Sequence, residues 1–187
     1  MWKEILDKLK NKLENWTFRA LNLPSRLVLV KSVLQAIPLY QFSVALAPKG
    51  ILKKIRNLQR NFLWGNQKGE RKWALVNWKT VCLPKQEGGL GLRDPEDSSR
   101  VLGAKMWWRW VNYKSEPWAI LWHKKYAPHF AKEKLIRYKE DRKGSSMWKL
   151  AQKNRDLIQK HSFWEVRNGD QANFFQDAWQ QRRCIDL

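Results

Sequence analysis

Apolar residues in the first part of the chain recur at intervals typical of helices. The spacing predicts an amphipathic helix in the first segment, with a second helix beginning near Ser25 after the break at Pro24 and ending at Pro38. The expected apolar positions are Ile5, Leu6, Leu9, Leu13 and Trp16 in the first helix and Leu27, Val30, Leu34 and Ile37 in the second. Both helices are expected to pack together through these faces.

A third helix is predicted from Pro48, with Gly65 as its stop signal. Its apolar residues are Ile51, Ile55, Leu58 and Phe62. Four cations repeat the same spacing two positions earlier, and we call Lys49, Lys53, Arg56 and Arg60 the basic stripe. An offset of two residues is about 200° around a helix, so the stripe is expected opposite the apolar face.

The middle of the chain is predicted to hold short elements. Residues 73–76 are expected to form a strand, and Asn77 is expected to cap a brief helix that ends before Pro84. Gly88, Gly89 and Gly91 follow. Because neither the Walker spacing nor G-x-G-x-x-G is present, a tight turn with positive φ angles is favoured over a phosphate cradle.

Helices and tryptophans dominate the next part. Asp94 and Pro95 indicate the start of a long helix to about Tyr113, apolar nearly all round and expected at the centre of the core. Another helix is predicted from Ser115, with Trp118, Leu121, Trp122 and Tyr126 on one face. Because the tryptophan spacing follows helix packing, a core role is favoured over base stacking.

The predicted fold class is mainly α, a bundle of about five to six helices with a short C-terminal β-hairpin. The hairpin is expected at 164–174, where Asn168-Gly169 favours a type I′ turn, after a helix capped by Ser145 or Ser146. Residues 128–144 have mixed charge and weak periodicity. The expected domains are therefore a helical unit at 1–127, a linker at 128–144 and a small module at 145–187.

The charge pattern points to an anionic partner. The net charge is +20, and no Asp or Glu occurs between Asn15 and Gly69, a stretch that holds the basic stripe as well as Arg19, Arg26 and Lys31. A stretch without acids has no internal counter-ions, so nucleic acid is the first expected partner. A solvated outer face is the structural alternative, but the lack of interleaved acids favours phosphate contact by the stripe.

Other chemistry has little support in the sequence. The cysteines, Cys82 and Cys184, have no CxxC spacing, and the three histidines are scattered, so we expect no zinc site, no disulfide framework and no cofactor. The apolar runs fall far short of a membrane span, and the N-terminus is a poor signal peptide. We expect an intracellular protein, nuclear or cytoplasmic and not secreted, without membrane insertion.

Five stretches of the chain, in the order in which they occur, resemble the region downstream of the catalytic palm in plant non-LTR (LINE-type) retrotransposon reverse transcriptases. They are RLVLVKSVLQAIPLY (26–40), FLWGN (62–66), LPKQEGGLGLRD (83–94), SEPWAILWHKKY (115–126) and FWEVRNGDQANFFQDAW (163–179). The resemblance covers nearly the whole chain. It implies a thumb-and-connection fragment, whose parent role would be to grip the template and primer duplex.

The chain departs from that family in three places. It lacks the Y/F-x-D-D carboxylates that hold magnesium for reverse transcription, and it ends at Leu187, where the family usually continues into a Cys/His-rich module. The family's small-residue turn is replaced by residues 22–25. The resemblance therefore implies a fragment severed from the palm and from the zinc-binding module, with no catalytic or metal-binding residues.

Two functions from different classes remain open. The first is a noncatalytic fragment that binds RNA or an RNA/DNA hybrid through phosphates, with little sequence specificity. The second is a recruited protein-interaction factor that inhibits or poisons a host partner, or that self-associates, since a severed domain exposes apolar surface. A fragment without a selected activity is a third alternative.

Overall fold

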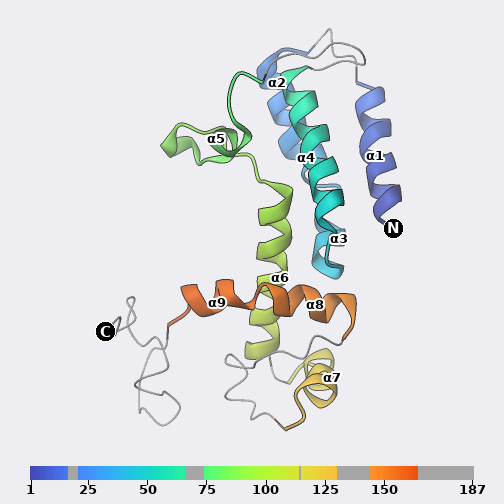
Figure 1. Cartoon of the computed structure of the whole chain (residues 1–187), viewed down its shortest axis with the longest axis vertical. Coiled ribbons are helices and arrows are strands. Elements are labelled where there is room, and N and C mark those ends of the chain that lie inside the picture. Colours follow the sequence, from blue (N-terminus) through green and yellow to red (C-terminus); the bar gives the residue numbers. More distant parts are fainter. Residues whose placement is uncertain (17–20, 66–73, 114, 130–143, 164–187) are drawn as a thin grey trace. The chain divides into compact units, whose positions relative to one another are not determined.

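The computed structural model describes residues 1–16, 21–65, 74–113, 115–129 and 144–163. Over these residues the chain is mainly helical, which confirms the predicted class, and the described part holds no strand. The chain divides into two compact units, Met1–Arg100 and Val101–Leu187 (Figure 1). The hairpin predicted at 164–174 and most of the linker predicted at 128–144 lie outside the described residues.

Unit 1 is built around one long helix. The elements are α1 (Trp2–Glu14), α2 (Leu23–Leu29), the π-helical η2 (Val30–Leu34), α3 (Leu39–Val44), α4 (Lys49–Trp64), α5 (Trp78–Cys82), the 3₁₀ turn η3 (Lys85–Glu87) and the start of α6 (Pro95–Asn112). Helix α4 packs against α1, α2 and η2. Leu9, Leu34 and Ile55 are fully buried and come from three of these elements, so they form part of the core of this unit.

Several helix boundaries follow local signals that the sequence contains. Asn22 caps α2 by accepting a hydrogen bond from the Ser25 amide at 3.0 Å, so this helix begins slightly before Ser25. Asn77 caps α5 in the same way, as predicted. Gly65 ends α4 with φ of 71°, and Gly88 and Gly91 also have positive φ, which confirms the predicted stop and the predicted tight turn.

Three expectations in unit 1 are wrong in detail. The buried residues of α4 are Leu52, Ile55, Gln59, Phe62 and Leu63, so Ile51 and Leu58 lie at the edge of the buried face. Pro48 is the residue before α4 and does not occupy its first turn. The described part of the predicted strand, 74–76, forms a bend that exposes its side chains to solvent.

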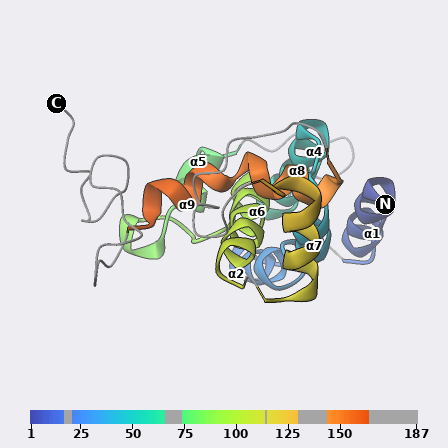
Figure 2. The same ribbon diagram turned by 90° about the horizontal axis from the view of Figure 1, so that it is seen from below.

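Unit 2 is organised by tryptophans. Its described elements are the rest of α6, then α7 (Pro117–Tyr126), α8 (Ser146–Lys153) and α9 (Arg155–His161). Trp107 and Trp110 of α6 meet Trp122 of α7 and Trp148 of α8 in one buried cluster, and Figure 2 shows α7 and α8 beside α6. The predicted core role is confirmed for Trp107, Trp110 and Trp122.

The chain on both sides of the predicted linker meets in unit 2. The Tyr126 ring stacks on Trp148 with ring centroids 4.2 Å apart, and its hydroxyl accepts a hydrogen bond from the Ser145 amide. Ser145 caps α8, as one of the two predicted alternatives. The contact with Ser145 lowers the pKa of the Tyr126 hydroxyl, since a hydrogen bond to the phenolate stabilises it.

Two of the expected core helices also have solvent-facing apolar residues. In α6, Val101 and Trp108 are 61% and 42% exposed, so one apolar side of this helix faces solvent instead of the core. In α7, Leu121 is 62% exposed. Val101 and Trp108 are seven residues apart, which is about two helical turns, so they lie on one side of α6. The buried side of α6 carries Ala104, Trp107 and Trp110.

Candidate nucleic-acid interface

Three members of the predicted basic stripe lie on one flank of α4, roughly 100° around the helix from the centre of its buried face, so the stripe is not opposite that face as predicted. Lys49, Lys53 and Arg60 are exposed, and we call these three residues the outer basic face. Helix α4 contains no acidic residue, so the face has no i to i+4 partner on its own helix. Lys49 also lies in the first turn, where the positive end of the helix dipole adds to its potential.

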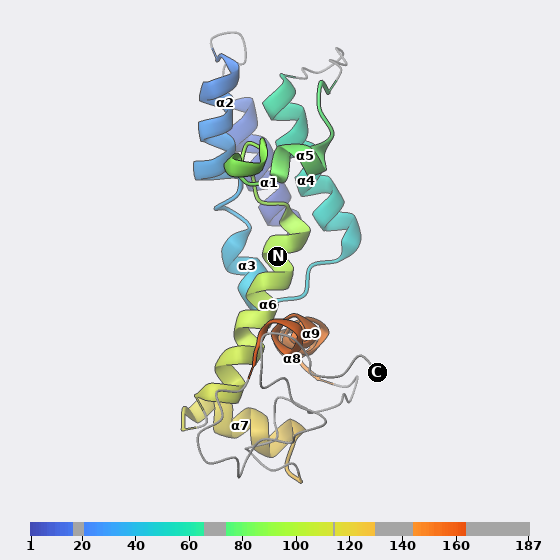
Figure 3. The ribbon, with the colours of Figure 1, turned by 90° about the vertical axis from the view of Figure 1, so that its left-hand side faces the viewer.

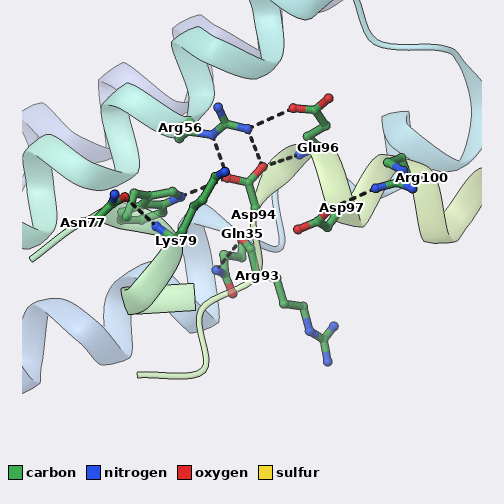
Figure 4. Close-up of polar contacts among 10 residues, drawn as sticks. Gln35, Arg56, Asn77, Lys79, Arg93, Asp94, Glu96, Asp97 and Arg100 are labelled. Carbon is green, nitrogen blue, oxygen red and sulfur yellow. Dashed lines mark hydrogen bonds and ion pairs between the residues drawn. The ribbon is translucent and has the colours of Figure 1, made fainter. Parts of the chain in front are cut away.

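Arg56 differs from the other three. Its Nε donates to Asp94 Oδ2 at 2.6 Å and its Nη2 donates to Asp94 Oδ1 at 2.7 Å, a two-point contact with one carboxylate (Figure 4). Nη2 also donates to Glu96 Oε2 at 3.1 Å. The expectation that the whole stripe lacks acidic partners is therefore wrong at Arg56, because the acid-free stretch folds against acids that come later in the chain.

Asp94 is the centre of this polar cluster. Its carboxylate accepts from Trp78 Nε1 at 3.0 Å and from the Glu96 amide at 2.8 Å, so the same side chain caps α6 and anchors α4 and α5. Only 12% of the side chain is exposed. The Asp94 hydrogen bonds raise the pKa of the Arg56 guanidinium despite its partial burial, so Arg56 stays charged.

Arg26 occupies a structural position. A Cβ placed on Gly65 would overlap Nη1 of the Arg26 guanidinium, so this side chain lies directly against the glycine that ends α4. The carbonyl end of a helix is the negative end of its dipole, which favours a cation there. Arg26 is half-buried and is better explained by this contact than by contact with an external phosphate.

The remaining predicted cations lie elsewhere. Lys31 belongs to η2, and its Nζ lies close to Gly91 in the tight turn. Arg19 lies outside the described residues. Two cations that were not predicted as site residues also lie in this unit: Lys54 is exposed on α4, and the stem of Lys85 lies against Gly91. Their charge was visible in the sequence, but their neighbours were not.

Little else in the described residues suggests a reactive site. No group of three or more His, Cys, Asp or Glu side chains there could hold a metal ion, and no described helix is long and apolar enough to cross a membrane. Cys82 is a free thiol, and burial raises its pKa to about 11, so it is protonated at neutral pH. Cys184 lies outside the described residues.

Comparison with known proteins finds relatives in plants. The chain is 34% identical over 178 residues to a putative ribonuclease H protein of Arabidopsis thaliana, an alignment that covers 94% of the chain and 28% of that protein. It is 25% identical over 145 residues to an uncharacterized mitochondrial protein of the same plant, which covers 77% of the chain and 92% of that protein. No protein-family model and no solved structure matches.

The two alignments differ in what they cover. The chain spans little more than a quarter of the length of the first relative, so it corresponds to a segment of a longer protein there. The second relative is aligned over nearly its whole length, so a polypeptide of similar extent occurs in a plant. The chain is thus similar to a segment of the first plant protein and to almost the whole of the second.

Proposed function

We propose that this chain is a noncatalytic nucleic-acid-binding fragment derived from a plant retrotransposon reverse transcriptase, and that it contacts the phosphates of RNA or an RNA/DNA duplex. The observation that carries the proposal is the outer basic face of α4, where Lys49, Lys53 and Arg60 are exposed on a helix without acids. The ordered resemblance of five sequence phrases to the post-palm region supports the retroelement origin. The plant relatives agree with that origin.

Phosphate contact explains the charge distribution better than solvation alone. An acid three or four residues away can pair with a cation on a helix surface, and α4 has no acid. Released counter-ions would supply the binding free energy, so affinity is expected to depend steeply on salt and weakly on sequence. The noncatalytic part of the proposal rests on the sequence, which contains no Y/F-x-D-D motif.

The test is a salt series of binding to a fluorescein-labelled RNA/DNA hybrid, with an RNA duplex and an unrelated hybrid sequence for comparison. The test variant is Lys49→Gln, Lys53→Gln and Arg60→Gln together, and the matched control is Lys105→Gln, Lys149→Gln and Lys153→Gln. All six residues are exposed, and the control lies in unit 2. Gln preserves helix propensity, and circular dichroism checks folding.

The expected result is a loss of affinity in the test variant that is similar for unrelated sequences. Its log–log salt slope should shrink by about 2–3 units, since each lost phosphate contact removes about 0.7–0.9. The control should change the slope less, although it loses the same charge. Equal slopes in the two variants would assign binding to net charge alone and would remove the outer basic face from the proposal.

A protein-interaction role is the second candidate, and the exposed side of α6 favours it. Val101 and Trp108 present apolar surface to solvent on one side of that helix. Self-association is the simplest form of this role to measure. Light scattering over a concentration series should show a dimer that Val101→Ser with Trp108→Ser abolishes, whereas a monomer at all concentrations would count against it.

A further inference from the structure

Residues 91–94 run from a turn beside Lys31 to the carboxylate that binds Arg56 of α4. At one end Gly91 lies beside Lys31 of η2, and at the other end Asp94 holds Arg56 of α4. Between them the Arg93 carbonyl accepts a hydrogen bond from Gln35 Nε2 at 3.0 Å. Figure 3 shows the chain around α5 in front of α2 and α4. This short segment therefore contacts η2, the residue that follows η2, and α4.

Two lysines converge at Gly91. A Cβ built there would lie 3.7 Å from Lys31 Nζ and 3.8 Å from Lys85 Cγ. Gly91 has φ of 63°, a conformation that L side chains rarely adopt, so the turn requires glycine and leaves space for both lysines. Lys31 comes from η2 and Lys85 from η3, so only the fold brings the Lys31 ammonium and the Lys85 stem to the same turn.

The acids near this turn are mostly engaged elsewhere. Asp94 and Glu96 bind Arg56, and Asp97 pairs with Arg100 at 3.7 Å. Neither Lys31 nor Lys85 forms an ion pair with an acid in the described part of the chain. Glu87 is two residues from Lys85 and exposed, so it is the nearest competing charge along the chain.

The outer basic face borders the same segment. Arg56 marks the side of α4 that meets Asp94, and Lys49, Arg60 and Lys53 follow at about 20°, 40° and 60° further around the helix. The lysine pair lies at the other end of residues 91–94. A polyanion that lies on this side of unit 1 can therefore meet cations at both ends of the segment.

We propose that Lys31 and Lys85 form a second phosphate contact for the nucleic acid that binds the outer basic face. This proposal rests on the proposed function. The ligand is a phosphodiester of the same RNA/DNA hybrid, and the ammonium groups act as point charges toward it. Gly91 leaves room for both side chains, and contacts with phosphates read no base, so the site adds affinity without sequence preference.

Lysine footprinting of the wild-type complex tests the two basic regions separately. The protein is acetylated with and without the RNA/DNA hybrid, and mass spectrometry reports each lysine. The proposal expects slower acetylation of Lys31 and Lys85 in the complex, whereas Lys105, Lys149 and Lys153 should react equally in both samples. Protection of Lys49 and Lys53 with unchanged Lys31 and Lys85 would overturn the second contact and leave the proposed function standing.

The opposite protection pattern would distinguish the second contact from the outer basic face. Protection of Lys31 and Lys85 without Lys49 and Lys53 would support the second contact and remove the outer basic face. Absence of a complex at the lowest salt would overturn both. The variant Lys31→Gln with Lys85→Gln should reduce the salt slope by about 1.4–1.8, and Lys31→Arg with Lys85→Arg should restore it. An unchanged slope in the folded Gln variant would overturn the proposal.

Discussion

The side-chain amide of Gln59 donates a hydrogen bond to the backbone carbonyl of Leu34 at 3.3 Å, in the core of unit 1. Four residues after Leu34 stands Pro38, which has no N–H to donate to that carbonyl as an α-helix would require. Gln59 is only 1% exposed and supplies the donor from α4. The break that proline makes in one helix is therefore compensated by a polar side chain buried on another.

Replacing Gln59 with Met should destabilise the protein, because the Leu34 carbonyl would lose its donor while the volume stays similar. The expected loss in the free energy of unfolding is about 1–2 kcal/mol. Urea denaturation followed by circular dichroism measures it. Lys54→Met is the matched control on the exposed surface of the same helix and should change stability by less than about 0.5 kcal/mol. Equal effects would show that the hydrogen bond contributes nothing.

Arg56 and Arg60 lie four residues apart on α4 and should respond differently to Gln. Arg56→Gln removes the contacts with Asp94 and Glu96, and we expect a loss of about 1–2 kcal/mol of stability after allowance for its partial exposure. Arg60→Gln should leave stability within about 0.5 kcal/mol and weaken nucleic-acid binding. Chemical denaturation measures stability and fluorescence anisotropy measures binding for both variants. A stability loss at Arg60 with a binding loss at Arg56 would contradict this prediction.

Gly50 in α4 and Gly65 at its C-terminal cap give opposite predictions for alanine. At Gly65, φ is 71° and a Cβ would collide with the Arg26 guanidinium, so Gly65→Ala should destabilise the protein by about 1–2 kcal/mol. At Gly50 nothing lies within 4 Å of the new Cβ, and Gly50→Ala should stabilise it by about 0.4–1 kcal/mol. Thermal melts report both changes, and the same sign for both would contradict the prediction.

Glu96 places an exposed negative charge beside Arg56, next to the outer basic face of α4. Glu96→Gln should tighten binding to an RNA/DNA hybrid, because it removes a charge that repels phosphate while Asp94 still holds Arg56. Binding at low salt gives the largest difference, since screening reduces it at high salt. Glu4→Gln on α1 is the control. A variant that binds no better than this control would place the nucleic acid elsewhere.

The Cys82 thiol should make stability fall at alkaline pH. Burial raises its pKa from 9.0 to about 11, so the folded state favours the neutral thiol. This contribution is fully present below pH 9, and it is lost as the pH rises toward 11 because the unfolded chain ionises first. Comparing the pH dependence of urea unfolding with that of Cys82→Ala isolates it from the lysines and tyrosines. Identical profiles would contradict the shift.

The sequence by itself determined the mainly helical class and most local boundaries. Asn77, Asp94, Ser145 and Gly65 act at helix ends through contacts within a few residues, and such contacts depend only on the local order of residues. Spacing also indicated that Lys49, Lys53 and Arg60 of α4 are exposed. It erred by about one residue on the buried side, since Ile51 and Leu52 are equally apolar and only packing against α1, α2 and η2 selects between them.

Only the tertiary structure decided which charges remain available. Four cations at regular spacing look equivalent in the sequence, yet Arg56 meets Asp94, 38 positions later, and the other three meet no acid on their helix. The Lys31 ammonium and the Lys85 stem likewise lie against one turn, more than fifty residues after Lys31. The physical reason is that ion pairing depends on distance in space, and residues far apart in the sequence become neighbours only when the helices pack.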